Sequence, residues 1–352
     1  MRRLLILLLA GLVTSLLFVA PANAVKTGSE FPPGIWRGKA VWTGTITNGT
    51  VTVSVAGAGI IDFEMTVAPD GTVTDGDYIL HSTNINENIA GVGPVTASVA
   101  AMGNMTGTGA MVTGNGNFNI KIISWPLPVA PMEFGESGGS LGFYPATASC
   151  TFVQGDMAEL ARDIQQAAGF STSIKAPFTA TRISAPGEKG SQSWDENYVE
   201  LVTAMETLAS QPKPAIQDVK DLANKVDLFN VNLVKSSTCS DTPKNLQKGK
   251  QPYNYFLEKF SQLMTKILSD PSGYSGADIS DLLMIAVHIG AVGSAAPDDA
   301  AAQQLEASFK QVLGQKLQAD IAANDETDII LIYIAAAQAG FTELAAQAKA
   351  AL

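Results

Sequence analysis

The sequence predicts an α+β protein of two domains: an N-terminal antiparallel β-barrel or sandwich, then an all-helical bundle or stack of helical hairpins. Residues 25–185 contain short apolar–polar alternations separated by turn residues, which is the pattern of half-buried strands. Residues 195–352 instead carry apolar side chains at helical spacing. The polar, glycine-containing stretch 186–194 between them is typical of a linker. With 352 residues, 46% of them hydrophobic, the chain can bury two cores.

Residues 1–24 have the layout of a secretory signal peptide. Met1-Arg2-Arg3 is basic, Leu4–Ala20 is apolar, and Ala22-Asn23-Ala24 offers a small-residue cleavage site. We therefore expect a mature chain from Val25 that is secreted or periplasmic. No later apolar run reaches the roughly 18 residues of a membrane helix, so no membrane span is expected after cleavage. The net charge of −11 disfavours nucleic acid as a partner.

The predicted β domain begins with the strand Gly34–Trp42. Val51–Val55 and Ile61–Val67 follow, and turn residues such as Pro69-Asp70-Gly71 separate the strands. Asn48-Gly49 and Asn115-Gly116 are predicted as further turns. The other expected strands are Asp77–Ser82, Val95–Ala101, Phe118–Ile122, Leu141–Tyr144, Ala148–Val153 and Phe178–Ile183. A barrel is preferred to a sandwich because closure removes exposed strand edges.

One helix is predicted inside the β domain, over residues 156–168. Met157, Leu160 and Ile164 recur at helical spacing, and Gly169 can end the helix. We expect this helix to lie across one end or side of the sheet.

The C-terminal half predicts a series of helices broken by proline and glycine. Pro212 and Pro214 separate the first two, and Gly340 ends the sixth. The expected helices are Asp195–Ser210, Pro214–Lys235, Tyr253–Ser269, Asp278–Val292, Asp298–Ala323, Glu326–Gln338 and Thr342–Ala351.

The first strand carries a short motif of a known family. Gly34-x-Trp36 resembles the start motif of lipocalin-type barrels, in which an arginine near the end of the barrel packs over the tryptophan. Arg182, after the last predicted strand, is its candidate match. The resemblance implies barrel topology for the N-terminal half only, because the helical half is not part of that family.

Two cysteines, Cys150 and Cys239, are the whole cysteine content of the chain. In an exported protein this number favours one disulfide, and the alternative is two separately buried thiols. A disulfide would attach the loop after the second predicted helix to the β domain.

The motifs for catalysis lack their structural context. Ser137 lies in Gly-x-Ser-x-Gly, but a proline-rich stretch precedes it and no helix follows, so we expect a glycine loop. His81 is expected at the surface and His288 in the core of an apolar helix. No phosphate loop or dinucleotide fingerprint occurs, so we name no catalytic residue and expect no cofactor.

Three acidic residues form a weak candidate calcium site. Asp70, Asp75 and Asp77 surround one predicted hairpin, and carboxylates at a turn are calcium ligands. The spacing lacks the EF-hand pattern, and solvated turn acids are the alternative interpretation, so no metal is expected.

Trp36, Trp42 and Phe63 are candidates for lining a barrel that holds an apolar ligand. The alternative interpretation of these aromatics is ordinary core packing. The function we expect is an exported, non-catalytic binding or interaction protein, with a small apolar ligand or a protein as its partner. One alternative is a hydrolase with a site at the domain interface. The other is a structural or assembly protein that docks a partner through its helical domain.

Overall fold

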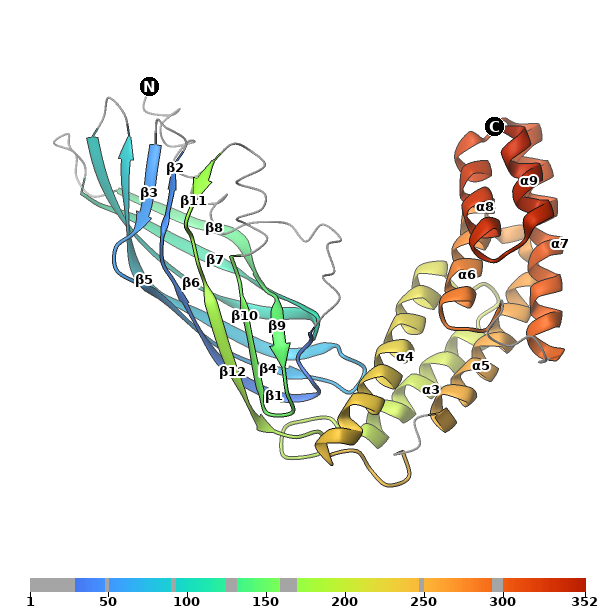
Figure 1. Ribbon diagram of the computed structural model, residues 1–352, viewed down its shortest axis with the longest axis horizontal. Coiled ribbons are helices and arrows are strands. Elements are labelled where there is room, and N and C mark those ends of the chain that lie inside the picture. The colour runs from blue at the N-terminus through green and yellow to red at the C-terminus, as the bar shows by residue number, and fades with distance from the viewer. Residues whose placement is uncertain are drawn as a thin grey trace. The chain divides into compact units, whose positions relative to one another are not determined.

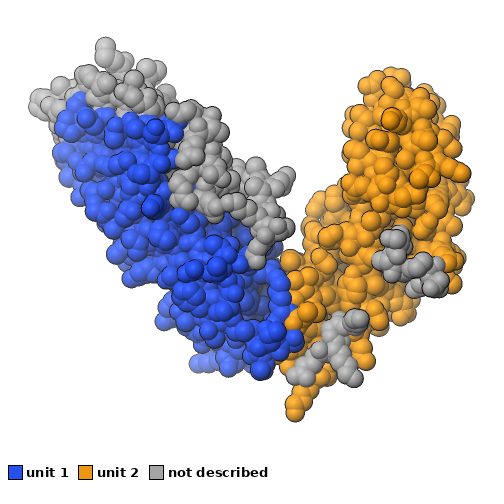
Figure 2. Space-filling model, in the orientation of Figure 1, with its two compact units in different colours: residues 1–194, 235–241 blue, residues 195–234, 242–352 orange. Residues whose placement is uncertain are grey.

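A computed structural model describes residues 29–47, 51–89, 93–124, 132–158, 170–246, 250–292 and 300–352. The predicted signal peptide, the predicted Asn48-Gly49 turn and most of the predicted helix 156–168 lie outside these residues. The chain divides into two compact units (Figure 2): unit 1 is Met1–Trp194 with Lys235–Asp241, and unit 2 is Asp195–Val234 with Thr242–Leu352. The predicted α+β class is confirmed, with the strands first and the helices second in the chain (Figure 1).

The strands of unit 1 belong to one antiparallel sheet. Their bounds are β1 Gly34–Trp42, β2 Thr45–Thr47, β3 Val51–Val55, β4 Gly59–Val67, β5 Val73–Ile89, β6 Gly93–Thr108, β7 Met111–Ser124, β8 Met132–Phe143, β9 Pro145–Ala148, β10 Phe152–Asp156, β11 Ser171–Thr172 and β12 Pro177–Ser184.

The sheet curls into a nearly closed barrel. The neighbour order runs β8, β7, β6, β5, β4, β1, β12, β10, β9, and β5 pairs with β3 beyond the end of β4. The two outermost strands, β8 and β9, are separated in the chain by Tyr144 alone. This architecture is compatible with the lipocalin-type resemblance (Figure 1).

Two local predictions for the β domain are wrong. Asn115-Gly116 is not a turn but lies inside β7, where Gly116 pairs with Gly103. A Cβ on Gly116 would lie 2.2 Å from the carbonyl oxygen of Met102 and 2.7 Å from the Oη of Tyr78, so no larger residue fits here without a shift. Cys150 lies in the turn between β9 and β10 rather than within a strand.

Aromatic rings fill one end of the barrel interior. Phe63 contacts Phe143 edge to face at 4.8 Å between ring centroids, and Phe31 contacts Trp36 and Phe178 at 5.6 and 5.9 Å. In one row of cross-strand neighbours, two adjacent rings are flanked on both sides by small residues: Ala180, Gly38, Phe63, Tyr78, Gly103 and Gly116. Large and small side chains therefore interlock, as dense core packing requires.

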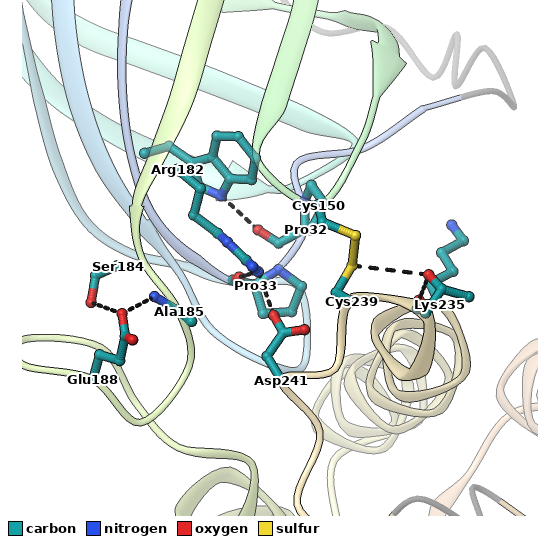
Figure 3. A network of polar contacts seen from close by, with 12 residues as sticks. Pro32, Pro33, Cys150, Arg182, Ser184, Ala185, Glu188, Lys235, Cys239 and Asp241 are labelled. Atoms are coloured by element: carbon teal, nitrogen blue, oxygen red, sulfur yellow. Dashed lines mark hydrogen bonds and ion pairs between the residues drawn. A yellow bond between two sulfur atoms is a disulfide. The ribbon is translucent and has the colours of Figure 1, made fainter.

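The segment Lys235–Asp241 is attached to the aromatic end of the barrel (Figure 3). The predicted disulfide is present: Cys150 and Cys239 are bonded, with their Cα atoms 5.5 Å apart. Arg182 donates to Asp241 at 2.5 Å, and both side chains are only 9% exposed. Arg182 also donates to the carbonyl of Pro33 at 3.3 Å. A covalent bond and a buried ion pair thus fix this short segment.

The lipocalin-type arginine has a defined position beside the tryptophan. Arg182 is the direct cross-strand partner of Trp36 in the pairing of β12 with β1. The indole Nε1 of Trp36 donates to the carbonyl of Pro32 at 2.7 Å, so this end of the barrel is well hydrogen-bonded.

Unit 2 is helical, and its helices follow the predicted series. Their bounds are α3 Trp194–Ser210, α4 Ile216–Ser236, α5 Lys250–Ser269, α6 Gly276–His288, α7 Ala300–Ala323, α8 Glu326–Gln338 and α9 Thr342–Ala351, with a short 3₁₀ turn at Pro271–Gly273. Another 3₁₀ turn, Ser237–Cys239, lies in the segment that belongs to unit 1. Within the described part of the chain, no helix is both long and apolar enough to cross a membrane.

Aromatic packing and a helix cap stabilise unit 2. Tyr198, Phe229 and Phe256 join α3, α4 and α5, with ring centroids 5.3 to 6.2 Å apart. At the start of α6 the Ser275 hydroxyl accepts from the Asp278 backbone, and the Asp278 carboxylate accepts from the Ser275 backbone. This reciprocal capping box satisfies two N–H groups that the helix itself leaves unpaired.

Candidate ligand site in the barrel

The barrel end away from the aromatic cluster is lined by aliphatic side chains and one carboxyl. Pairing of β11, β2, β3, β5 and β6 places five residues in one transverse row: Thr172, Ile46, Val53, Glu87 and Val95. The apolar members are buried, and Glu87 itself is only 6% exposed. Strand alternation turns Glu87 inward with Ile85, while Asn86 and Asn88 are exposed.

The next row toward the aromatic core contains only small or aliphatic residues. Val55, Ile85, Ala97 and Ile122 are successive cross-strand partners on β3, β5, β6 and β7. Ile85, Ala97 and Ile122 are all buried. Among the described residues, the wall at this end of the barrel is thus apolar except for a single acidic side chain that points inward.

Glu87 has no hydrogen-bond or ion-pair partner among the described residues. Its cross-strand neighbours are Val53 and Val95, neither of which has a side-chain donor. Burial raises the pKa of the Glu87 carboxyl to about 7, because the apolar surroundings disfavour its charged form. Buried polar groups in proteins are nearly always hydrogen-bonded, so we expect this carboxyl to have a partner that is not among the described residues.

Trp42 supplies a second unpaired polar atom inside the barrel. It is 3% exposed, and its indole Nε1 has no acceptor in the part of the chain that the structure describes. Trp42 lies four positions before Ile46, which belongs to the same transverse row as Glu87. Its ring covers Gly59, where an added Cβ would fall 1.5 Å from Nε1. An indole donor and a carboxyl thus occur along one largely apolar interior.

The other two predicted ligand-lining aromatics lie in the packed end. Trp36 is fully buried beside Phe31, and Phe63 packs between Phe143 and Phe178. A Cβ on Gly38 would lie 2.2 Å from the Phe63 ring, which leaves little room around it. Of the three predicted aromatics, Trp42 is the one nearest the aliphatic end.

The predicted calcium ligands do not converge. Asp70 is buried in the turn after β4 and accepts from the backbone N–H of Thr72 at 3.0 Å. Asp75 and Asp77 lie exposed on β5. Within the described ranges, no three His, Cys, Asp or Glu side chains are grouped so that they could hold a metal ion.

The residues considered for catalysis are dispersed. His81 is exposed as expected and contacts Asp62 at 2.7 Å. His288 is not in the core: it lies exposed at the end of α6 and contacts Asp227 at 3.3 Å. Ser137 lies within β8, opposite Phe118, and so at neither a glycine loop nor a strand-to-helix turn. The apolar residues around His288 suggested a buried position, but the helix exposes this side chain to solvent.

Unit 2 has an open groove lined mainly by α5 and the start of α7. Its lining includes Leu257, Ser261, Thr265 and Ala301, together with Glu258. The one carboxylate in the lining, Glu258, already accepts a hydrogen bond from Gln262 at 3.2 Å. The groove therefore lacks the unpaired buried group that distinguishes the barrel site.

Comparison with models of protein families, with curated protein sequences and with solved structures finds no match for this chain. The lipocalin-type resemblance is thus limited to a compatible barrel with a Gly-x-Trp motif and a neighbouring arginine.

Proposed function

We propose that this chain is an exported, non-catalytic binding protein that holds a small apolar ligand in the Glu87 end of its barrel. The observation that carries the proposal is a buried carboxyl in a row of aliphatic side chains, with no partner among the residues that the structure describes. Ligand pockets commonly combine apolar walls with a few polar groups that orient the ligand. A small barrel is either filled by its own side chains or wide enough to hold one small ligand.

The two ends of the barrel differ in packing, and we assign them different roles. The aromatic end is packed, cross-linked through Cys150 and closed by the Arg182–Asp241 ion pair. Dense packing at that end stabilises the barrel and leaves no space for a ligand. The aliphatic end carries smaller side chains and the unpaired Glu87, so it is the end suited to a ligand.

A fluorescence titration tests the proposal. The purified, oxidised chain is titrated with N-phenyl-1-naphthylamine, an uncharged apolar dye that brightens when it leaves water. We expect saturable binding of one dye per chain. Ala97→Phe should weaken it at least about tenfold by filling the site, whereas Thr96→Phe, on the outer face of the same strand, should not.

Folding of each variant is checked by tryptophan fluorescence and far-UV circular dichroism. If Ala97→Phe proves unstable, Val99→Phe makes the same test one inward position further along β6. Absence of saturable dye binding, or equal binding by the inward and outward variants, would refute a ligand site at this end.

A further inference from the structure

The chemistry around Glu87 specifies the kind of ligand head group that this site would favour. Its cross-strand partners Val53 and Val95, and Ile85 two positions along β5, offer neither charge nor donors. No inward-facing described residue of β2, β3 or β6 titrates. On β5 the next inward titratable group is Tyr78, whose pKa burial raises to about 12, so it stays neutral.

An ionised carboxylate in such surroundings is unfavourable unless a cation accompanies it. Two basic residues of the described β domain, Lys121 on β7 and Lys175 just before β12, are exposed at its surface. The protein itself thus provides no counter-ion for Glu87 within the described barrel interior. A ligand that brings a positive charge and N–H donors would satisfy the carboxylate.

We propose that Glu87 binds the ammonium head group of an apolar amine, while the aliphatic rows contact its hydrocarbon body. This inference rests on the proposed function and names its ligand class. An alkyl alcohol offers one neutral donor, and an alkyl carboxylate would bring a second negative charge. Hydrogen bonds to charged groups are roughly twice as strong as neutral ones, so we expect at least about tenfold preference for the amine.

Binding of the amine should depend on pH in a definite direction. An alkylamine stays protonated below about pH 10, as lysine does. Glu87, with its pKa raised to about 7, is mostly neutral at pH 5.5 and mostly ionised at pH 8. Amine binding should therefore tighten as pH rises across this range, while alcohol binding should change little.

Competition for bound N-phenyl-1-naphthylamine provides the test, with decylamine, decan-1-ol and decanoate as competitors at pH 8. In the wild-type chain, decylamine should displace the dye at concentrations at least about tenfold lower than decan-1-ol. Glu87→Gln should abolish this preference but keep alcohol binding. Glu64→Gln removes an equal charge from the outer face and should keep the preference.

Each outcome decides between the two proposals. Equal displacement by amine and alcohol, or a preference for decanoate, would overturn the head-group assignment while dye binding still supports a ligand site. Failure of the dye to bind would refute both. Should Glu87→Gln not fold, the wild-type comparison at pH 5.5 and pH 8 decides alone, and a preference for amine that does not weaken at pH 5.5 contradicts the inference.

Discussion

Removing the disulfide should destabilise unit 1 by several kcal/mol. Cys150 and Cys239 are 89 positions apart in sequence. Cross-linking a loop of this length lowers the entropy of the unfolded chain by an amount equivalent to about 4.6 kcal/mol at 25 °C. If Asp195–Val234 stays folded in unit 2 while unit 1 unfolds, the mobile loop is roughly halved, which reduces the gain by about 0.6 kcal/mol because the dependence is logarithmic.

The measurement is urea unfolding of the Cys150→Ala/Cys239→Ala variant against the oxidised wild type. All four tryptophans precede Asp195, so their fluorescence reports unit 1, while circular dichroism at the helical wavelength mainly reports unit 2. We expect the fluorescence midpoint to fall by a shift equivalent to 2–5 kcal/mol, the usual cost of losing a native disulfide.

Reduced wild-type protein is the control, because it lacks the cross-link but keeps both side chains. It should unfold like the double variant. A fluorescence midpoint that stays within the equivalent of about 0.5 kcal/mol of the oxidised protein, a shift expected of ordinary surface changes, would contradict the loop argument. It would mean that the Arg182–Asp241 ion pair and its neighbours alone keep the segment in place.

Three further predictions concern the barrel. Burial raises the Glu87 pKa from 4.5 to about 7, so as pH rises the unfolded chain loses this proton before the folded chain does. The free energy of unfolding of the wild type should therefore fall by about 3 kcal/mol between pH 4.5 and pH 7. Urea unfolding of Glu87→Gln should not show this fall. Asp241→Asn leaves the buried guanidinium of Arg182 without its counter-charge and should cost about 3–5 kcal/mol in the same assay. Gly38→Ala places a Cβ 2.2 Å from a buried ring and should lower the thermal midpoint by an overpacking cost of about 1–3 kcal/mol, whereas Gly138→Ala, which meets nothing within 4 Å, should not.

Local patterns in the sequence sufficed for most elements and for the fold class. Alternation in Ile61–Val67 predicted a strand, and the structure has β4 at Gly59–Val67. The helical series was predictable because proline, glycine and apolar spacing act within a few residues of one another. The disulfide was predictable from composition alone, because the chain has only two cysteines and its first residues have the pattern of a signal peptide.

Glu87 was missed because the predicted strand stopped at Ser82, whereas β5 continues to Ile89. Extending the alternation would have placed Glu87 on the same face as the apolar Ile85, and this was the available signal. Only strand register could show that Val53 and Val95 surround the carboxyl without a donor. A partner across a sheet is set by long-range pairing, which no local pattern encodes.

Tertiary structure also decided which glycines are turns and which aromatics are core. Asn115-Gly116 has the composition of a hairpin turn, yet it lies inside β7, where the two residues pair with Asn104 and Gly103 of β6. Trp36 and Phe63 are equally compatible with a lined cavity or a packed core, and ring contacts with Phe31 and Phe143 place them in the core. The sequence by itself determined the periodicity, the elements and their order. The structure decided which side chains fill the barrel and which polar groups, Glu87 among them, lack a partner among the described residues, because volume and hydrogen-bond balance depend on residues far apart in the chain.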